Sequence, residues 1–358
     1  MIEDVKDTLA ASLARYSEII DVRSPDEFAL DHIPGAINLP VLDNEQRKTV
    51  GTMYVQQSKF LASRVGAAMV SRNIASYLEG HLADKPGSYA PLIYCWRGGN
   101  RSGAMATILS RVGWRVGLLQ GGYKTYRRAV MARLYGEALS LKLVVLGGAT
   151  GSGKTVMLQA LAKLGVQIID LEALAAHRGS LFGGLSHEPQ PGQKLFESRL
   201  LQVVDSLDPA RPVVIEAESS RVGDVMVPPA LWQVMVKAPR IELQVPADAR
   251  ARHIAEVYHD IAADKATLDA LLQRLPRHHS KADLEHWRQL GREGQAEALA
   301  LALIEAHYDP AYQRSGAVSA PGLAGTLVLA DLSADERDRG AHALRQMVQT
   351  LYASSPQD

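Results

Sequence analysis

The only cysteine of the chain, Cys95, stands between an apolar run and a glycine-rich stretch. The run Pro91 to Tyr94 predicts a buried strand, Gly98 and Gly99 allow a tight loop, and residues 104–112 predict a helix. Backbone N–H groups of such a loop, the positive end of the helix and nearby guanidinium groups would lower the pKa of a thiol. We therefore predict that Cys95 is a nucleophile, largely thiolate at neutral pH, and not an inert core thiol.

A second glycine-rich segment, Gly148 to Thr155, fits the pattern G-x-x-x-x-G-K-[ST]. The apolar run 141–146 before it predicts a strand, and residues 156–164 after it predict a helix, which is the context the pattern requires. Backbone N–H groups and the helix dipole would hold a diphosphate there, and the Thr155 hydroxyl is a group that can bind Mg²⁺. The predicted diphosphate-binding residues are Gly148, Gly151, Ser152, Gly153, Lys154 and Thr155.

Acidic residues end the next two predicted strands, residues 166–170 and 212–216. Either Asp170 or Glu216 could orient a metal ion at the phosphate loop, and Glu172 and Glu218 are the nearby alternatives. The sequence does not choose among these carboxylates, so no metal ligand is certain at this point.

The elements that position these groups alternate between short apolar strands and helices, which predicts parallel sheets covered on both faces. With 358 residues, the chain exceeds what one core usually supports. We predict an α/β protein of two domains, residues 1–135 around Cys95 and residues 136–358 around the phosphate loop. The second domain carries helical additions after residue 256 and ends in a strand and a helix. Ligands of such sheets bind at the carboxyl ends of the strands.

Composition excludes several classes of protein. The N-terminus carries early acidic residues and does not resemble a secretory signal, and no apolar run approaches the roughly 20 residues that cross a bilayer. A single cysteine fits a reducing compartment, so we expect a cytoplasmic location. The formal net charge is zero, which does not favour a dedicated nucleic-acid binder. Two basic stretches, 124–133 and 274–292, could contact a polyanion or could be solvated faces.

The first domain resembles a rhodanese domain in three stretches: DVRSPDEFALDHIPGAINLP, YCWRGGNRSG and LLQGGYKTYR. This resemblance implies that Cys95 transiently carries a chalcogen atom as a persulfide or perselenide. Many rhodanese loops close with the fifth residue after the cysteine, whereas Arg101 is the sixth here. The longer loop implies a wider anion cradle, formed by Arg97, Gly98, Gly99 and Arg101, that admits selenophosphate. We interpret Asp21, Arg23 and Glu27 as a network that holds the fold and not as catalysts.

Nearly the whole chain resembles tRNA 2-selenouridine synthases through both loops and through DLEALAAHRGSLFGG, GQKLFESRL, VVIEAESSRVG and HYDPAYQR. The resemblance implies that geranyl diphosphate alkylates a wobble 2-thiouridine of tRNA and that selenium from selenophosphate then replaces the S-geranyl group. It also implies a selenophosphate-supplying enzyme as a partner. Two alternatives remain at this point: an ATP-dependent kinase or adenylating enzyme coupled to sulfur transfer, and a non-enzymatic anion-binding module. The sequence does not locate the tRNA surface, select the tRNAs or fix the oligomeric state.

Overall fold

The computed structural model describes residues 1–358 except 9, 180–182, 185–188, 276–278, 315–321 and 354–358. Contacts divide the chain into two compact units, Met1–Gly136 with Gly192–Ser206, and Glu137–Pro191 with Leu207–Asp358. The predicted boundary after residue 135 placed segment 192–206 in the second domain, whereas this segment belongs by its contacts to the first unit. Among the described residues, no helix combines the length and the apolar character that crossing a bilayer requires.

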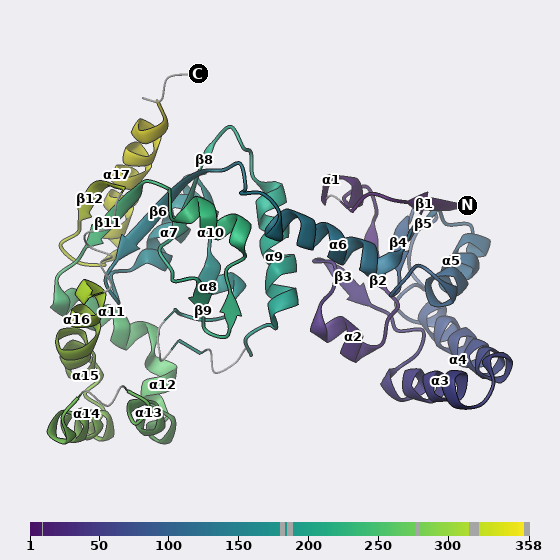
Figure 1. The fold of residues 1–358 in the computed structure, drawn as a ribbon, viewed down its shortest axis with the longest axis horizontal. Coiled ribbons are helices and arrows are strands. Elements are labelled where there is room, and N and C mark those ends of the chain that lie inside the picture. The colour runs from purple at the N-terminus through teal and green to yellow at the C-terminus, as the bar shows by residue number, and fades with distance from the viewer. Residues whose placement is uncertain (9, 180–182, 185–188, 276–278, 315–321, 354–358) are drawn as a thin grey trace. The chain divides into compact units, whose positions relative to one another are not determined.

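The first unit is built on a parallel sheet in the order β1-β5-β4-β2-β3 (Figure 1). Its strands are β1 Ile2–Val5, β2 Glu18–Asp21, β3 Ala36–Asn38, β4 Pro91–Tyr94 and β5 Val116–Leu119. Its helices are α1 Ala10–Leu13, α2 Pro25–Leu30, α3 Asn44–Gln56, α4 Lys59–Glu79, α5 Asn100–Val112, α6 Gly122–Tyr135 and α9 Gln193–Ser206. Apolar side chains of α4 and α5, among them Ile74 and Met105, form a core with Ile20 and Ile93 of the sheet.

The second unit has a parallel sheet in the order β12-β11-β6-β8-β7 and a short hairpin, β9 with β10. Its strands are β6 Lys142–Gly148, β7 Gln167–Ile169, β8 Pro212–Glu216, β9 Arg221–Val222, β10 Val225–Met226, β11 Arg240–Gln244 and β12 Leu323–Val328. Helices α7 Lys154–Lys163 and α17 Ala334–Ala353 cover one face of this sheet, where Val144 and Leu146 pack against Leu158 and Leu344. These two sheets confirm the predicted fold class.

The helical addition of the second unit has a core of its own. It contains α11 Ala247–Val257, α12 His259–Ala263, α13 Lys265–Leu272, α14 Lys281–Glu293, α15 Ala296–Leu303, a π-helix Ile304–Tyr308 and α16 Asp309–Arg314. The two remaining helices of the unit are α8 Leu171–Leu174 and α10 Pro229–Met235. Trp287 of α14 is the largest buried side chain in the core of the addition, and Leu272 and Leu303 pack in the same cluster.

Candidate active sites

The Cys95 loop is supported from behind by the start of α6. Cys95 follows β4 directly, and its carbonyl oxygen accepts the N–H of Tyr123 at 2.8 Å. Gly122 has φ +57°, and a Cβ at this position would lie 2.2 Å from the same carbonyl oxygen. Gly98 has φ +67°, and a Cβ there would lie 2.9 Å from backbone atoms of Leu119 and Gly121, at the end of β5. Gly98 and Gly122 are therefore required because two backbone segments approach each other closely at these positions.

Hydrogen-bond donors surround the thiol of Cys95. Ser102 of α5 donates its hydroxyl to Sγ at 3.1 Å, and backbone N–H groups of Arg97, Gly99 and Ser102 also act on the sulfur. Burial raises the pKa of the Cys95 thiol, but these donors outweigh it and hold the pKa below its ordinary value. Only 4% of Cys95 is exposed, because the loop folds over it. A reactant must therefore bring its reacting atom into the loop.

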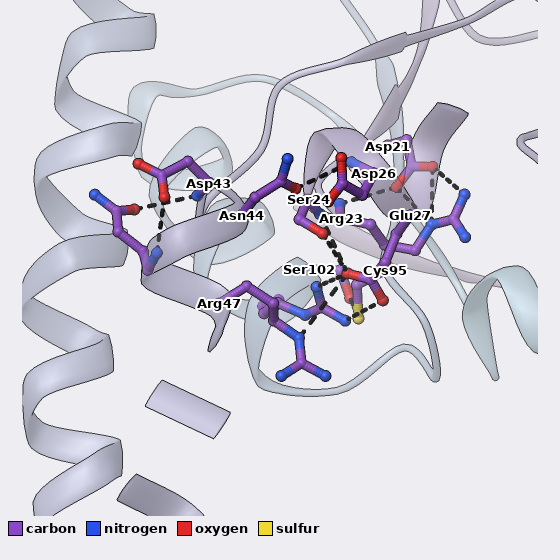
Figure 2. Close-up of polar contacts among 12 residues, drawn as sticks. Asp21, Arg23, Ser24, Asp26, Glu27, Asp43, Asn44, Arg47, Cys95 and Ser102 are labelled. Carbon is purple, nitrogen blue, oxygen red and sulfur yellow. Dashed lines mark hydrogen bonds and ion pairs between the residues drawn. The ribbon is translucent and has the colours of Figure 1, made fainter. Parts of the chain in front are cut away.

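The two arginines of the loop differ in their partners, and their predicted role in binding an anion stays a prediction. The Arg101 guanidinium pairs with Glu27 at 2.7 Å. Burial alone would raise the pKa of Glu27, but this pair outweighs burial and lowers it. Figure 2 labels Glu27 together with Cys95 and Ser102. The side chain of Arg97 is exposed, and its backbone N–H is the group that acts on the sulfur. The thiolate is thus stabilised by N–H and O–H dipoles, and sequence reasoning missed Ser102. In the sequence, the only indication of this role of Ser102 is that a small polar residue lies on an otherwise apolar helix face.

The charged residues beside β2 hold the fold, as the sequence interpretation favoured. Asp21 and Arg23 form a buried ion pair at 2.6 Å, and Arg23 also donates to the carbonyl oxygen of Asp31 at 2.6 Å. The guanidinium of Arg23 lies over the ring of Tyr123, 4.1 Å from its centroid. Arg23 therefore ties β2 and the turn after α2 to the start of α6, which supports the Cys95 loop.

The phosphate loop has the backbone that its sequence pattern predicts. Gly151 and Gly153 have φ of +80° and +78°, and the loop leads directly into the N-terminus of α7. Lys154 donates from Nζ to the carbonyl oxygen of Gly148 at 3.0 Å. The Ser152 hydroxyl is buried and has no hydrogen-bond partner among the described residues. Because a buried hydroxyl without a partner costs free energy, an anion oxygen in the loop would satisfy it.

One of the four candidate carboxylates contacts the phosphate loop through a hydrogen bond. Glu172 accepts the hydroxyl of Thr155 at 2.7 Å, whereas Asp170 caps α8 by accepting the N–H of Ala173 at 2.8 Å. Glu216 is fully buried and positions Glu172 by accepting its N–H at 2.7 Å. Burial, with Asp170 and Glu172 nearby, holds the pKa of Glu216 well above its usual range.

A Mg²⁺ ion would find oxygen ligands at this loop. Thr155 and Glu172 offer the hydroxyl and carboxylate oxygens that Mg²⁺ takes. Among the residues that the structure describes, no three His, Cys, Asp or Glu side chains form a cluster able to hold a metal ion. The predicted Mg²⁺ therefore stays a prediction, with these two residues and the phosphates of a ligand as its ligands.

The basic face of α6 is occupied by a partner helix. Arg127 pairs with Glu197 of α9, and Arg133 pairs with Asp205 of α9 at 3.1 Å. Glu197 is 1% exposed and also accepts the hydroxyl of Tyr135 at 2.5 Å. These arginines are part of a helix–helix contact, so this half of the stretch 124–133 does not present a row of cations to a polyanion.

The second basic stretch is also internally paired. Arg288 pairs with Asp269 at 2.5 Å, and Arg292 pairs with Glu285. Trp287 is 2% exposed and belongs to the core of the helical addition. Residues 276–278 of this stretch lie outside the described residues. Interleaved aromatic and basic side chains on α14 are therefore explained by packing within the addition.

A thiol loop at the carboxyl end of one parallel sheet and a phosphate loop at the carboxyl end of another define a fusion of a rhodanese-like domain with a P-loop domain. Residues 2–129 match the family model described as a rhodanese-like domain. Residues 141–271 match the model described as the tRNA 2-selenouridine synthase AAA domain. The chain therefore belongs to the tRNA 2-selenouridine synthase family, which confirms the resemblance seen in the sequence.

Curated relatives support the same family. The tRNA 2-selenouridine synthase of Chromohalobacter salexigens is 33% identical over 324 residues, covering 82% of this chain and 87% of the relative. That of Nitrosomonas europaea is 36% identical over 256 residues, covering 70% of this chain and 66% of the relative. In Nitrosomonas eutropha the identity is also 36%, and the match covers 69% of this chain and 64% of the relative. The chain thus spans slightly less than two thirds of the length of both Nitrosomonas relatives.

Proposed function

We propose that this protein converts 2-thiouridine at the wobble position of tRNA to 2-selenouridine in two steps. Geranyl diphosphate first alkylates the sulfur, and selenium from selenophosphate then replaces the S-geranyl group. Family membership supports the tRNA substrate and the selenium chemistry. One observation supports the assignment of each donor to a loop. Geranyl diphosphate and selenophosphate are both anions, and each unit holds one loop lined by backbone N–H groups.

The phosphate loop has an apolar cavity beside it, which supports a prenyl diphosphate as its ligand. Thr150 of the loop lines this cavity together with Ile254, Tyr258 and Leu299 of the helical addition. The diphosphate would bind the loop, and the geranyl chain would enter the cavity. Each buried methylene contributes about 0.8 kcal/mol, so the chain would supply much of the affinity.

By sequence alone, four apolar residues are plausible lining of a geranyl pocket beside the diphosphate, or ordinary core: Leu181, Phe182, Leu185 and Phe196. Leu181, Phe182 and Leu185 lie outside the described residues. Phe196 is buried in α9, which belongs to the first unit. The apolar residues beside the phosphate loop come instead from α11, α12 and α15, more than 90 residues farther along the chain than Gly148.

A variant that fills the cavity tests whether the geranyl chain and the diphosphate of the donor bind at separate places. Ala255→Phe should weaken geranyl diphosphate binding about tenfold or more and leave inorganic diphosphate binding unchanged, because Ala255 lines the cavity and not the loop. Lys154→Ala should weaken both ligands. Isothermal titration measures both affinities. Equal affinity of wild type and Ala255→Phe for geranyl diphosphate would remove the cavity assignment, and ATP hydrolysis without geranyl diphosphate binding would favour the kinase alternative.

The Cys95 loop is the proposed site of selenophosphate, made by a separate supplying enzyme. The Cys95 thiolate attacks selenium, an S–Se bond forms, and the Se–P bond breaks as phosphorus leaves with the bonding pair as phosphite. The terminal selenium then attacks C2 of the base and displaces geranyl thiolate. Because Cys95 is the only cysteine, an external thiol must cleave the remaining S–Se bond and leave selenium on C2.

Removal of the thiol tests this role. Cys95→Ala should abolish 2-selenouridine and leave geranylated tRNA, whereas Lys154→Ala should reduce geranylation itself. Mass analysis of nucleosides, from tRNA incubated with the purified protein and both donors, measures both products. Phosphorus NMR of the wild-type reaction should show phosphite. Selenouridine formed by Cys95→Ala, or a cysteinyl phosphate in the wild type, would contradict selenium transfer through Cys95.

A further inference from the structure

The hairpin formed by α3 and α4 of the first unit ends in a tip with exposed apolar side chains (Figure 1). Phe60 is 78% exposed, Val55 is 83% exposed and Tyr54 is 50% exposed. Behind the tip the two helices pack closely, since a Cβ on Gly66 of α4 would lie 3.2 Å from Val50 of α3. Single exposed apolar residues are ordinary, whereas a cluster of large ones at one turn indicates an interaction site.

The same hairpin is basic along its length. Between Glu45 and Glu79 the sequence has no acidic residue and has five basic ones, Arg47, Lys48, Lys59, Arg64 and Arg72. All five are exposed. Within the described part of the chain, Arg47 is the only one of them with an acidic partner, Glu27. The other four charges are therefore available to a polyanion, unlike the paired arginines of α6 and α14.

Cations and aromatic rings share the tip of this hairpin. The ammonium group of Lys59 lies 5.7 Å from the centroid of the Tyr54 ring, which brings the start of α4 onto the end of α3. Arg64 is one helical turn from Phe60, so their side chains are neighbours on α4. The buried residues of α4 occupy the other side of the helix: Ala62, Gly66, Val70 and Ile74. The tip thus presents two rings and two cations together.

The hairpin begins beside the Cys95 loop. Arg47, near the start of α3, lies 4.0 Å from Glu27, and Glu27 pairs with Arg101 of the loop (Figure 2). Tyr54 is seven residues farther along α3, which is nearly two turns, so it lies on the same side of the helix as Arg47 and about 10 Å away. This side of α3 therefore leads from the tip toward the loop that holds the thiol.

We propose that the tip of this hairpin binds single-stranded RNA, with Tyr54 and Phe60 stacking on unpaired bases and Lys59 and Arg64 neutralising phosphates. This inference rests on the proposed function and adds to it the surface that holds the anticodon loop of the tRNA. Proteins that bind single strands combine exposed aromatic rings, on which bases stack, with cations that follow the backbone.

Charge favours RNA over a second copy of this chain as the partner of the tip. A second copy would bring the same cations to the contact and would be repelled, whereas RNA supplies a negative charge at every nucleotide. A loop bound at the tip and along the Arg47 side of α3 brings its neighbouring nucleotides toward Cys95. The hairpin would therefore hold the tRNA where the proposed selenium transfer takes place.

Fluorescence anisotropy measures stacking, with the whole protein and a labelled anticodon stem-loop that carries 2-thiouridine at the wobble position. Phe60→Ala should weaken binding about tenfold, because one stacked base is lost, and Phe60→Trp should bind as tightly as the wild type. A duplex of the stem alone has no unpaired bases, so its affinity should be the same for the wild type and Phe60→Ala. Val112→Ala, at an exposed apolar residue that ends α5, is the matched control. Alkylation of Cys95 at the wild-type rate shows that Phe60→Ala folds.

Salt dependence measures the phosphate contacts. The double variant Lys59→Ala/Arg64→Ala should reduce the slope of log Kd against log salt concentration by about 1.4, because each phosphate neutralised on a single strand contributes about 0.7. Arg111→Ala/Arg115→Ala is the matched control and should leave the slope unchanged. These two exposed arginines lie where α5 ends and β5 begins, at the edge of the sheet opposite to Cys95.

The outcomes separate this inference from the proposed function. Phe60→Ala with the wild-type affinity for the stem-loop, or Lys59→Ala/Arg64→Ala with the wild-type salt slope, would overturn the inference alone. A sedimentation coefficient that changes in Phe60→Ala without a change in RNA affinity would also overturn it and would assign the tip to a second copy of the chain. If the wild type binds the stem-loop through this hairpin but forms no 2-selenouridine, the proposed function fails and the RNA-binding surface stands.

Discussion

Cys95 shows how hydrogen-bond donors can keep the pKa of a nearly buried thiol below its ordinary value. Burial penalises the thiolate, yet the hydroxyl of Ser102 and three backbone N–H groups point at the sulfur. Such dipoles are fixed by the fold of the loop, so they need no reorganisation when negative charge develops. The guanidinium of Arg101 is held by Glu27, which links α2 to the loop.

The Ser102 hydroxyl is the donor that can be removed with least disturbance. Ser102→Ala should raise the pKa of the Cys95 thiol, because the thiolate loses a hydrogen bond, and alkylation by iodoacetamide near pH 7 should slow about tenfold. The rate is measured against pH, and the single cysteine makes the signal unambiguous. Ser110→Ala, on the exposed side of the same helix, should leave the rate unchanged. An unaltered pH profile for Ser102→Ala would assign the lowered pKa to the backbone N–H groups alone.

Among the elements, helix α9 belongs to the first unit, although its position in the sequence would put it in the second. It lies between β7 and β8 of the second sheet along the chain, but it packs on α6 and α1 of the first unit. Glu197 is the buried centre of this contact and bonds Arg127, Tyr135 and Gln193. Helix α6 also supports the Cys95 loop, so α9 stabilises the element behind the thiol.

The contact between α9 and α6 should therefore contribute measurably to the stability of the first unit. Glu197→Ala leaves Arg127 without this carboxylate in a largely buried setting, and the free energy of unfolding of the first unit should fall by about 2–3 kcal/mol. Hydrogen exchange of the α6 amides in the whole protein measures the loss. Arg133→Ala removes a half-exposed partner of Asp205 and should cost about 1 kcal/mol or less. Equal effects of the two variants would show that burial of Glu197 does not govern the contact.

At the scale of the whole molecule, both loops obey one topological rule. Cys95 follows β4 and the phosphate loop follows β6, and each strand lies inside a parallel sheet with neighbours on both sides. The carboxyl end of a central parallel strand is open to a ligand because the connections to the helices diverge there. Two unrelated anion-binding loops in one chain therefore arise from the same arrangement of strands and helices.

Much of the fold could be predicted because strands and loops leave local patterns. The predicted strands at 91–94 and 212–216 match β4 and β8 residue by residue. Boundaries were less certain: α5 begins at Asn100 instead of residue 104, and β7 covers Gln167–Ile169 instead of residues 166–170. The edge strand β1 was missed, since the two adjacent acidic residues in its middle, Glu3 and Asp4, leave little apolar signal.

The sequence by itself determined the two chemical groups of this protein, the thiol of Cys95 and the phosphate loop at Lys154, because both depend on glycines and on residues adjacent in the chain. Tertiary structure decided which distant side chains complete them. Ser102 is chosen by the packing of α5, Glu172 by the meeting of β7 and β8, and Tyr312, whose hydroxyl accepts the N–H of Gly148, by the fold of the helical addition. Apolar and polar patterns specify that a face is buried or paired, and only the folded chain specifies its partner.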